Sequence, residues 1–250
     1  MRRIQILLSS IICITVLSCK SDDETILSVN PLDCVPTNLQ NAVVAYYPFT
    51  DGSINDFSGN NQNLTNSTAA ASTSDRNANE NCAFEFNYLS GTNEFLSTSN
   101  TTQLDDLTDF SISLWYQPLE VRTVYELLIG RGLDHNQWNL ALFDCRHAVF
   151  SWTSDVWDND PNFDCDESVS NHDWHHLVAT YNNSTNTMKL FRNGNVQETS
   201  DYMRYPNASH IEDLIVGNQF TGKIDDILIF NITLNQTDVD SLLNMEACCN

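Results

Sequence analysis

One stretch, residues 174–194, most strongly limits the folds that this chain can adopt. It reads Trp-His-His-Leu-Val-Ala-Thr-Tyr, then a polar break at residues 182–186, then Met-Lys-Leu-Phe-Arg-Asn-Gly. Successive side chains of an extended chain face opposite ways, and here neither face is purely polar, so the segment belongs in a sheet that is covered on both faces. The Asn, Ser and Thr residues of the break favour a turn, and Asn193-Gly194 favours a second reversal. The stretch therefore predicts an antiparallel hairpin and a third strand from Asn195.

Three further blocks accompany this hairpin in a fixed order. They are V-A-Y-Y-P-F at 44–49 with an Asp-, Asn- and Gly-rich loop at 51–60, F-S-I-S-L-W-Y-Q-P at 110–118, and G-K-I-D-D-I-L-I-F-N at 222–231. Together with the hairpin they resemble the laminin-G-like domains of the concanavalin A-like lectin/glucanase superfamily, over about Ala42 to Leu243. The resemblance implies an all-β, two-sheet antiparallel jelly-roll sandwich in which the first and last strands are neighbours.

Short apolar runs between turn signals define the expected strands. They lie near 43–49, 82–86, 95–97, 110–117, 125–130, 138–143, 148–152, 175–181, 187–192, 214–217 and 222–230. One short C-terminal helix is expected, because Asn235 can cap it with Asp238 three residues later and Val239, Leu242 and Leu243 form an apolar face. The polar stretch at 60–79 is expected to be a long surface loop.

The N-terminus has the features of an export signal. Arg2 and Arg3 precede an apolar run at 4–16 that is short for a membrane span, and V-L-S-C at 16–19 resembles a bacterial lipoprotein cleavage site. We expect a signal peptide at 1–18, lipidation of Cys19, a tether at 19–41 and one sandwich domain at 42–250. The alternative is an ordinary signal with a chance cysteine. The acidic run at 20–24 is similar to signals for the outer face of the outer membrane, or is simply a solvated tether.

Composition narrows the choice of partners. The chain has 33 acidic residues against 11 basic ones and a formal net charge of -22. Nucleic-acid binding requires a basic surface, so this class of partner is excluded. Contact with a membrane is expected through the lipid anchor only.

Six cysteines remain in the expected mature chain after Cys19. They are Cys34, Cys82, Cys145, Cys165, Cys248 and Cys249. An even number in an exported chain favours disulfides, and the sequence does not choose among the fifteen pairings that are possible for six cysteines. A Cys145–Cys165 bond would close a loop, and pairing of either residue with the C-terminal cysteines is the alternative. The family's neighbouring first and last strands imply that Cys34 and Cys82 are clasped to the C-terminus.

Catalysis has little support in the sequence. Related glucanases carry two Glu and an Asp as E-x-D-x-x-E on one strand, and this triplet does not occur in the chain. His172, His175 and His176 surround Trp174, but consecutive strand residues face opposite ways, so packed or surface histidines are favoured over zinc ligands. We therefore expect a protein that is not an enzyme.

The segment between Trp152 and Trp174 is longer and more acidic than a simple hairpin connection. Aromatic rings beside carboxylates suit a sugar, which stacks its C–H face on a ring and bonds polar side chains through its hydroxyls. The candidate ligand-binding residues are Trp152, Asp155, Trp157 and Asp158. The alternative is that Trp157 plugs the end of the sandwich and the acids form a solvated rim.

A structural calcium ion is expected between the opening loop and the closing strand. Asp51 and Asp56 lie in an oxygen-rich loop, and in related domains the first Asp of the "I-D-D" strand, here Asp225, reaches such a loop. Alternation predicts that Asp225 and Asp226 face opposite ways, so that only one serves the loop. The alternative is a pair of ordinary turns and a surface acid.

These observations favour a non-catalytic, lipid-anchored outer-membrane protein, exposed to the cell exterior, that binds carbohydrate or a glycosylated partner. Two alternatives remain open. The first is an adhesive envelope module with no sugar site, and the second is a divergent glycoside hydrolase. Fold alone does not choose among them, because loops carry specificity.

Overall fold

The computed structural model describes residues 30–88, 91–120, 124–132, 137–143, 147–158, 173–205 and 211–247. Several predictions fall outside these residues. They are the signal peptide at 1–18 and Cys19, Cys145, Cys165, Cys248 and Cys249.

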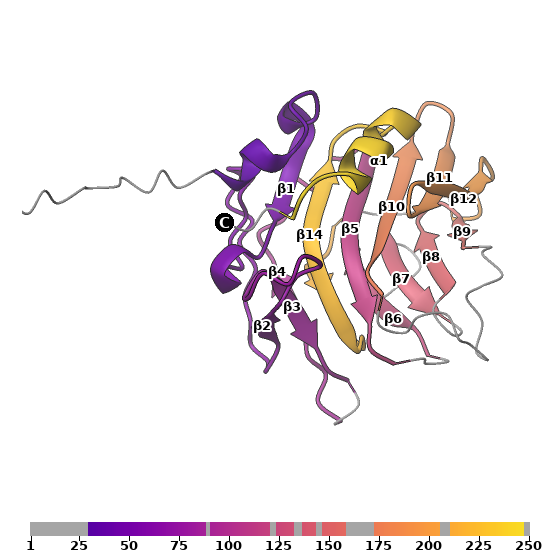
Figure 1. The fold of residues 1–250 in the computed structure, drawn as a ribbon. Helices are drawn as coiled ribbons and strands as arrows, with labels where there is room; N and C mark the ends of the chain where they lie inside the picture. The colour runs from indigo at the N-terminus through magenta and orange to yellow at the C-terminus, as the bar shows by residue number, and fades with distance from the viewer. Residues whose placement is uncertain are drawn as a thin grey trace, which may run out of the picture.

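Two antiparallel sheets form a sandwich (Figure 1). Sheet A has eight strands, in the order β12 (Asn195–Ser200), β11 (Thr187–Arg192), β10 (His175–Asn182), β5 (Phe110–Pro118), β14 (Gly222–Phe230), β3 (Ala83–Phe86) and β2 (Ala71–Thr73), with β1 (Val43–Tyr47) also paired to β14. Sheet B has six strands, in the order β4 (Leu96–Thr98), β13 (Leu214–Val216), β6 (Glu126–Arg131), β7 (Asn139–Phe143), β8 (His147–Ser151) and β9 (Asp155–Trp157). The predicted all-β sandwich is confirmed, and β1 and β14 are neighbours as the family resemblance implied.

Alternation along the central strands sorts their side chains between two apolar clusters. On β5, Phe110, Ile112 and Leu114 enter the main core between the sheets. On β10, Val178 belongs instead to a second cluster on the outer face of sheet A. His175 lies opposite Tyr116 and His176 opposite Trp115, so the two histidines occupy opposite faces, as predicted. The hairpin of β10 and β11 and the third strand, β12, also lie where the sequence predicts them.

The outer face of sheet A is covered by the C-terminal helix and by the segment before β1. Helix α1 (Gln236–Leu243) starts at the predicted Asn235–Asp238 capping box. Val239 and Leu242 pack in the second cluster with Val35 and Leu39, which precede β1. Figure 1 shows α1 over the outer face of the sheet that contains β14, β5 and β10.

This packing corrects the prediction that residues 19–41 form a tether. Short 3-10 helices form at η1 (Pro31–Cys34) and η2 (Gln40–Ala42), and a third, η3 (Thr50–Gly52), follows β1. Val35 and Leu39 are buried, so residues 31–41 belong to the folded domain. Burial of these apolar side chains against α1 is the physical reason, because a solvated tether would leave them in water.

Among the described residues, no helix is long and apolar enough to cross a membrane.

Candidate binding site

Residues 101–109 form the loop before β5, and buried side chains hold this loop against the sandwich. Leu104 and Leu107 are buried, and the buried Arg131 at the end of β6 reaches the loop from sheet B. Its guanidinium donates to Thr101 Oγ1 at 3.1 Å and to Asp105 Oδ1 at 2.6 Å. Burial lowers the pKa of Arg131, and Asp105 opposes that shift by stabilising the charged form. The loop is therefore held in a defined shape, and its remaining polar side chains are free to face solvent.

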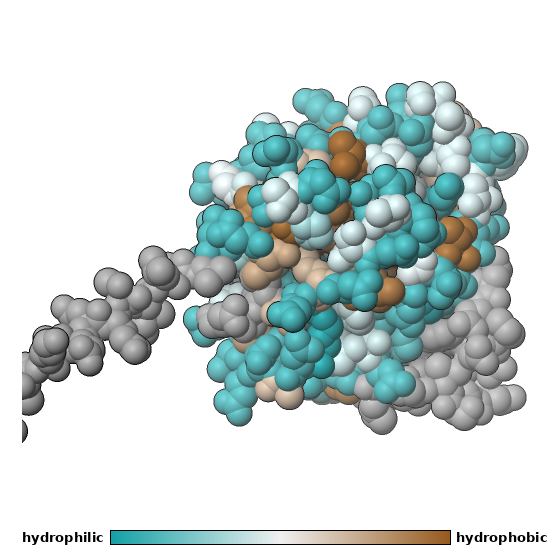
Figure 2. Space-filling model, turned by 45° about the horizontal axis from the view of Figure 1, so that its top comes forward, coloured by the Kyte–Doolittle hydropathy of each residue, from teal (hydrophilic) through white to brown (hydrophobic). Residues whose placement is uncertain are grey.

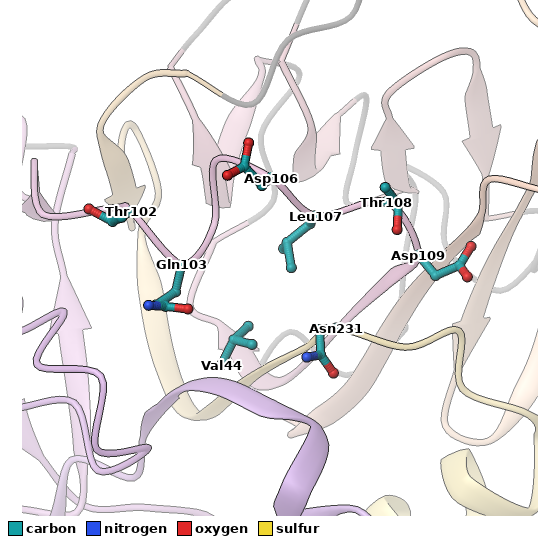
Figure 3. Close-up of a pocket in the computed structure, with 8 residues that line it drawn as sticks. All are labelled: Val44, Thr102, Gln103, Asp106, Leu107, Thr108, Asp109 and Asn231. Carbon is teal, nitrogen blue, oxygen red and sulfur yellow. The ribbon is translucent and has the colours of Figure 1, made fainter.

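Those side chains surround an open pocket at one end of the sandwich, which we call the end pocket. Its volume is about 450 Å³, and it is lined by Val44, Thr102, Gln103, Asp106, Leu107, Thr108, Asp109 and Asn231. Figure 3 shows Gln103 and Asn231 on opposite sides of the pocket, with Val44 between them. The pocket therefore joins the fixed loop to the ends of β1 and β14.

The lining of the end pocket is mainly polar. It offers two carboxylates, two amides and two hydroxyls above the apolar side chains of Val44 and Leu107. Asp109 Oδ1 accepts a hydrogen bond from the Asn183 backbone amide at 2.7 Å, which orients this carboxylate. No aromatic side chain lines the pocket. Such a site can form hydrogen bonds with a hydroxyl-rich ligand but cannot stack against its ring.

The four residues predicted to bind sugar do not form one surface. Trp152 is 4% exposed and packs in the core against Phe110 and Tyr181, and Asp158 is 2% exposed and forms an ion pair with Arg192. The prediction is corrected for these two residues, because core rings surround Trp152 and Arg192 occupies Asp158, so neither side chain is available to a ligand. Asp155 and Trp157 are only partly buried, on the edge strand β9.

The partly exposed pair is held by neighbours from other elements. Asp155 accepts hydrogen bonds from Ser151, Arg204 and Tyr205. Trp157 packs at 6.2 Å from the ring of Phe143 and beside an apolar cluster on the outer face of sheet B. A sugar-binding role for Asp155 and Trp157 stays a prediction, because residues 159–172 of the acidic segment lie outside the described residues.

The three predicted calcium ligands are not gathered around a common point. Asp56 is buried and accepts hydrogen bonds from the backbone amides of Tyr46, Ser58 and Gln62, whereas Asp51 is exposed. Within the described part of the chain, no group of three or more His, Cys, Asp or Glu side chains is placed to hold a metal ion. This ligand set does not fit a shared ion, and calcium binding itself stays a prediction.

Asp225 has a different partner from the one predicted. Arg76 Nη1 lies 2.9 Å from Asp225 Oδ2 and 2.6 Å from Asp226 Oδ2, and all three side chains are buried. The prediction that the two acids face opposite ways is therefore wrong. Asp226 has a backbone φ of 45° at a β-bulge, and this conformation brings both carboxylates to one guanidinium.

Burial controls the titration of this cluster. It raises the pKa of Asp225 well above its usual range, with the neighbouring carboxylate of Asp226 adding to the effect and Arg76 opposing it. Desolvation also lowers the pKa of His176 to about 3, with a smaller contribution from Arg76. His176 Nε2 and Ser113 Oγ are hydrogen-bonded at 2.8 Å, so this histidine is a packed neutral side chain. The preference for packed histidines over zinc ligands agrees with this geometry.

Among the predicted disulfide residues, the structure describes Cys34 and Cys82, and both are disulfide-bonded. The pairing of the six cysteines stays a prediction, because the other four fall outside the described ranges.

Comparison with protein families gives one match, over residues 89–240, to the family Laminin_G_3, described as the concanavalin A-like lectin/glucanases superfamily. The chain belongs to this family. The matched segment runs from before β4 into α1, and therefore contains most of both sheets of this laminin-G-like domain.

Solved structures with the same fold include toxin binding domains. The botulinum neurotoxin serotype D binding domain matches with a TM-score of 0.67 at 15% identity, covering 82% of this chain and 52% of that one. The binding domain of Paraclostridial Mosquitocidal Protein 1 matches with a TM-score of 0.66 at 19% identity, covering 82% and 52%.

A third structure concerns botulinum neurotoxin type C, whose cell entry is described as dependent on two ganglioside molecules. It matches with a TM-score of 0.65 at 16% identity, covering 83% of this chain and 52% of that one. The laminin-G-like chain thus spans about half the length of these neighbours, and identities this low show the fold alone. No curated protein matches the sequence.

Proposed function

We propose that this laminin-G-like protein is a non-catalytic binding module for carbohydrate or a glycosylated partner, and that the end pocket is its site. The observation that carries the proposal is the open pocket of about 450 Å³ on a fixed loop, lined by hydroxyl, amide and carboxylate side chains. A saccharide presents hydroxyls that both donate and accept, and this lining offers both kinds of partner.

Most polar side chains of the end pocket are available for a ligand. Within the described chain, Gln103, Asp106 and Asn231 have no side-chain hydrogen bond to another protein group. A ligand can therefore bond them without breaking an internal contact. Since the loop is already held by Arg131, ordering it on binding costs little conformational entropy.

Two further observations support a binding role over catalysis. The sequence lacks the paired-carboxylate strand of the related glucanases. One structural neighbour is described as a toxin binding domain, and another is described with gangliosides. Together they favour recognition as the role of this domain.

An adhesive protein–protein module is the second candidate. The consecutive residues Tyr202 and Met203 are 69% and 46% exposed, and apolar side chains mark contact surfaces where they form a contiguous patch. One structural neighbour is described in complex with rat synaptotagmin II. A pull-down that survives removal of glycans from the partner would favour this candidate.

Placement at the cell surface is part of the proposal. Lipidation of Cys19 after removal of residues 1–18 would anchor the domain to the outer membrane and leave the sandwich in the aqueous phase. Mass spectrometry of the protein from its native membrane tests this directly. A diacylated or triacylated N-terminal Cys19 supports the anchor, and an unmodified or different N-terminus contradicts it.

A glycan array with the full chain tests the binding site. Gln103→Ala and Asp106→Asn should each weaken saccharide binding about three- to tenfold, the range for losing one or two hydrogen bonds. Gln197→Ala, on the edge strand β12, is the matched control and should bind like the wild type. Trp157→Ala tests the site predicted from sequence.

The outcomes separate the two locations. Loss of binding in the end-pocket variants alone supports the proposal. Loss in Trp157→Ala alone moves the sugar site to β9. Absence of binding to every glycan overturns the proposed function.

A further inference from the structure

A second, smaller pocket lies on the outer face of sheet A, and we call it the threonine pocket. Its volume is about 220 Å³, and it is lined by Thr180, Asn182, Thr185, Thr187, Lys189 and Thr233. This volume is below the roughly 300 Å³ of the smallest pockets for drug-sized ligands, and it suits one sugar residue or a single substituent.

Strand register explains why these side chains meet. Thr180 pairs with Lys189, and Asn182 pairs with Thr187, across the β10–β11 hairpin. Directly opposite residues of an antiparallel pair face the same side, so all four point outward from sheet A. Thr233 joins them from the segment after β14, where its hydroxyl donates to the Tyr181 carbonyl at 2.8 Å.

Three groups of the pocket can donate to a ligand, namely the Lys189 ammonium, the Asn182 amide and the Thr180 hydroxyl. The hydroxyls of Thr185, Thr187 and Thr233 already donate to protein oxygens. Asn182 Oδ1 accepts from the Thr185 backbone amide at 3.0 Å and from two hydroxyls, so its amide NH₂ is the end left for a ligand. Thr180 is 1% exposed, and its Oγ1 has no hydrogen-bond partner in the structure. A buried hydroxyl without a partner is costly, and a ligand oxygen in the pocket would satisfy it.

The positive charge of Lys189 is not paired with an acidic side chain in the described residues. Every arginine in the described residues forms an ion pair: Arg76, Arg131, Arg192 and Arg204. Of the two lysines in the same ranges, Lys223 donates weakly to Ser74 Oγ at 3.5 Å. Lys189 is half-buried and has no ion pair or hydrogen bond with any described residue.

We infer that the threonine pocket binds an anionic group, a carboxylate or a sulfate ester, through Lys189, Thr180 and Asn182. The ammonium of Lys189 and the donors of Asn182 and Thr180 favour a ligand group that carries negative charge and only accepts. If the proposed function holds, that group belongs to an acidic saccharide. Asn183 follows Asn182 of the threonine pocket, and its backbone amide donates to Asp109 of the end pocket at 2.7 Å, so the two pockets lie near each other.

The net charge of the chain makes this pocket selective. With a formal charge of -22, the protein repels anions at long range, but beyond about 8 Å that repulsion is screened at physiological salt. Inside the pocket the short-range contacts of Lys189 dominate. Anions without a matching geometry should therefore not bind.

The inference is tested by titrating the full chain with four probes, followed by calorimetry and backbone-amide NMR. The probes are free glucuronate, inorganic sulfate, a glucuronate-containing disaccharide and the same disaccharide with its carboxylate reduced to a hydroxymethyl group. The acidic disaccharide should bind at least about tenfold more tightly than its neutral form, as expected for a charged hydrogen bond.

Variants identify the pocket. Lys189→Gln should weaken binding of the acidic disaccharide at least about tenfold, whereas Lys189→Arg should retain most of it. Lys223→Gln also removes one positive charge and is the matched control. Lys223 lies near the start of β14, whereas Thr233 of the threonine pocket follows the end of that strand. Thr180→Val keeps the shape of the side chain and should weaken binding without lowering the melting temperature, because the wild-type hydroxyl has no partner to lose.

The failures of the two proposals are distinguishable. Equal binding by Lys189→Gln and wild type, or equal binding of both disaccharides, overturns the anionic site even if the end pocket binds sugar. Shifts of the threonine-pocket amides with glucuronate or sulfate, without binding of any disaccharide, support the anionic site and overturn the saccharide function.

Discussion

At the scale of single residues, the cluster of Arg76, Asp225 and Asp226 shows how one backbone angle decides which charged groups come into contact. Ideal alternation would send the two carboxylates to opposite faces. The left-handed conformation of Asp226 turns both toward Arg76, which also lies 4.6 Å over the ring of Trp115. Two buried carboxylates then share one guanidinium, so ionising both leaves one negative charge without compensation. Burying such a charge is expensive, and the cluster should respond to pH.

We predict that Asp225→Asn makes the protein relatively more stable as pH rises. The pKa of Asp225 is raised on folding, so its stabilising contribution is complete below the unfolded pKa of about 3.9 and is lost as pH rises through the folded value. Asparagine does not ionise, and its amide oxygen can still accept the Asp226 backbone amide. The difference in unfolding free energy between variant and wild type should grow by up to about 1.4 kcal/mol per pH unit in that window.

Urea unfolding from pH 4 to pH 8 measures this difference, with Asp201→Asn as the control for loss of one exposed charge. A difference that stays constant over the whole range would contradict the prediction, since it would mean that Asp225 titrates alike in the folded and unfolded states.

At the scale of secondary structure, patterning in the sequence was sufficient for most strands. The hairpin at 175–192 and the closing strand at 222–230 have long apolar runs bounded by turn residues, and both appear as predicted. The missed strands β2 and β9 are three residues each and lie on sheet edges. Three residues are too few to show a clear alternation, so the sequence alone does not mark such short strands.

The candidate site was harder to predict than the fold. The partners Arg76 and Asp225 are 149 residues apart, and a polar loop gives no sign that Arg76 is buried. The end pocket consists of ordinary polar residues that only the fold brings together. By contrast, the pairs of the threonine pocket lie two residues apart on each strand of a predicted hairpin, so their shared face could have been inferred from the sequence.

For helix α1, we predict that Asn235→Ala destabilises the protein by about 1 kcal/mol, the usual cost of an N-cap. The Asn235 side chain accepts the Asp238 backbone amide, and alanine leaves this donor without a partner at the first turn of the helix. Ser241→Ala on the exposed side of the same helix is the control and should change stability by less than about 0.5 kcal/mol. Equal effects of the two substitutions in urea unfolding would show that the cap does not hold α1 in place.

At the scale of the whole molecule, the distribution of charge is more one-sided than the composition alone indicates. Three of the four described arginines are buried in ion pairs, so their charges do not offset the acidic surface. The face drawn in Figure 2 is mainly hydrophilic, with isolated hydrophobic residues. A surface of this kind favours solubility, and the mutual repulsion of its carboxylates opposes the compact state.

This repulsion leads to a prediction about salt that also tests the calcium ion expected from the sequence. Screening should raise the melting temperature as ionic strength rises, to the same extent with sodium, magnesium or calcium chloride at matched ionic strength. We expect no additional effect of calcium through Asp225, because Arg76 already contacts that carboxylate and Asp56 already accepts hydrogen bonds from backbone amides. Differential scanning calorimetry with and without chelator measures both effects. A rise in melting temperature at calcium concentrations too low to change ionic strength, abolished in Asp225→Ala, would instead establish the predicted ion, because only binding to the native state stabilises it by mass action.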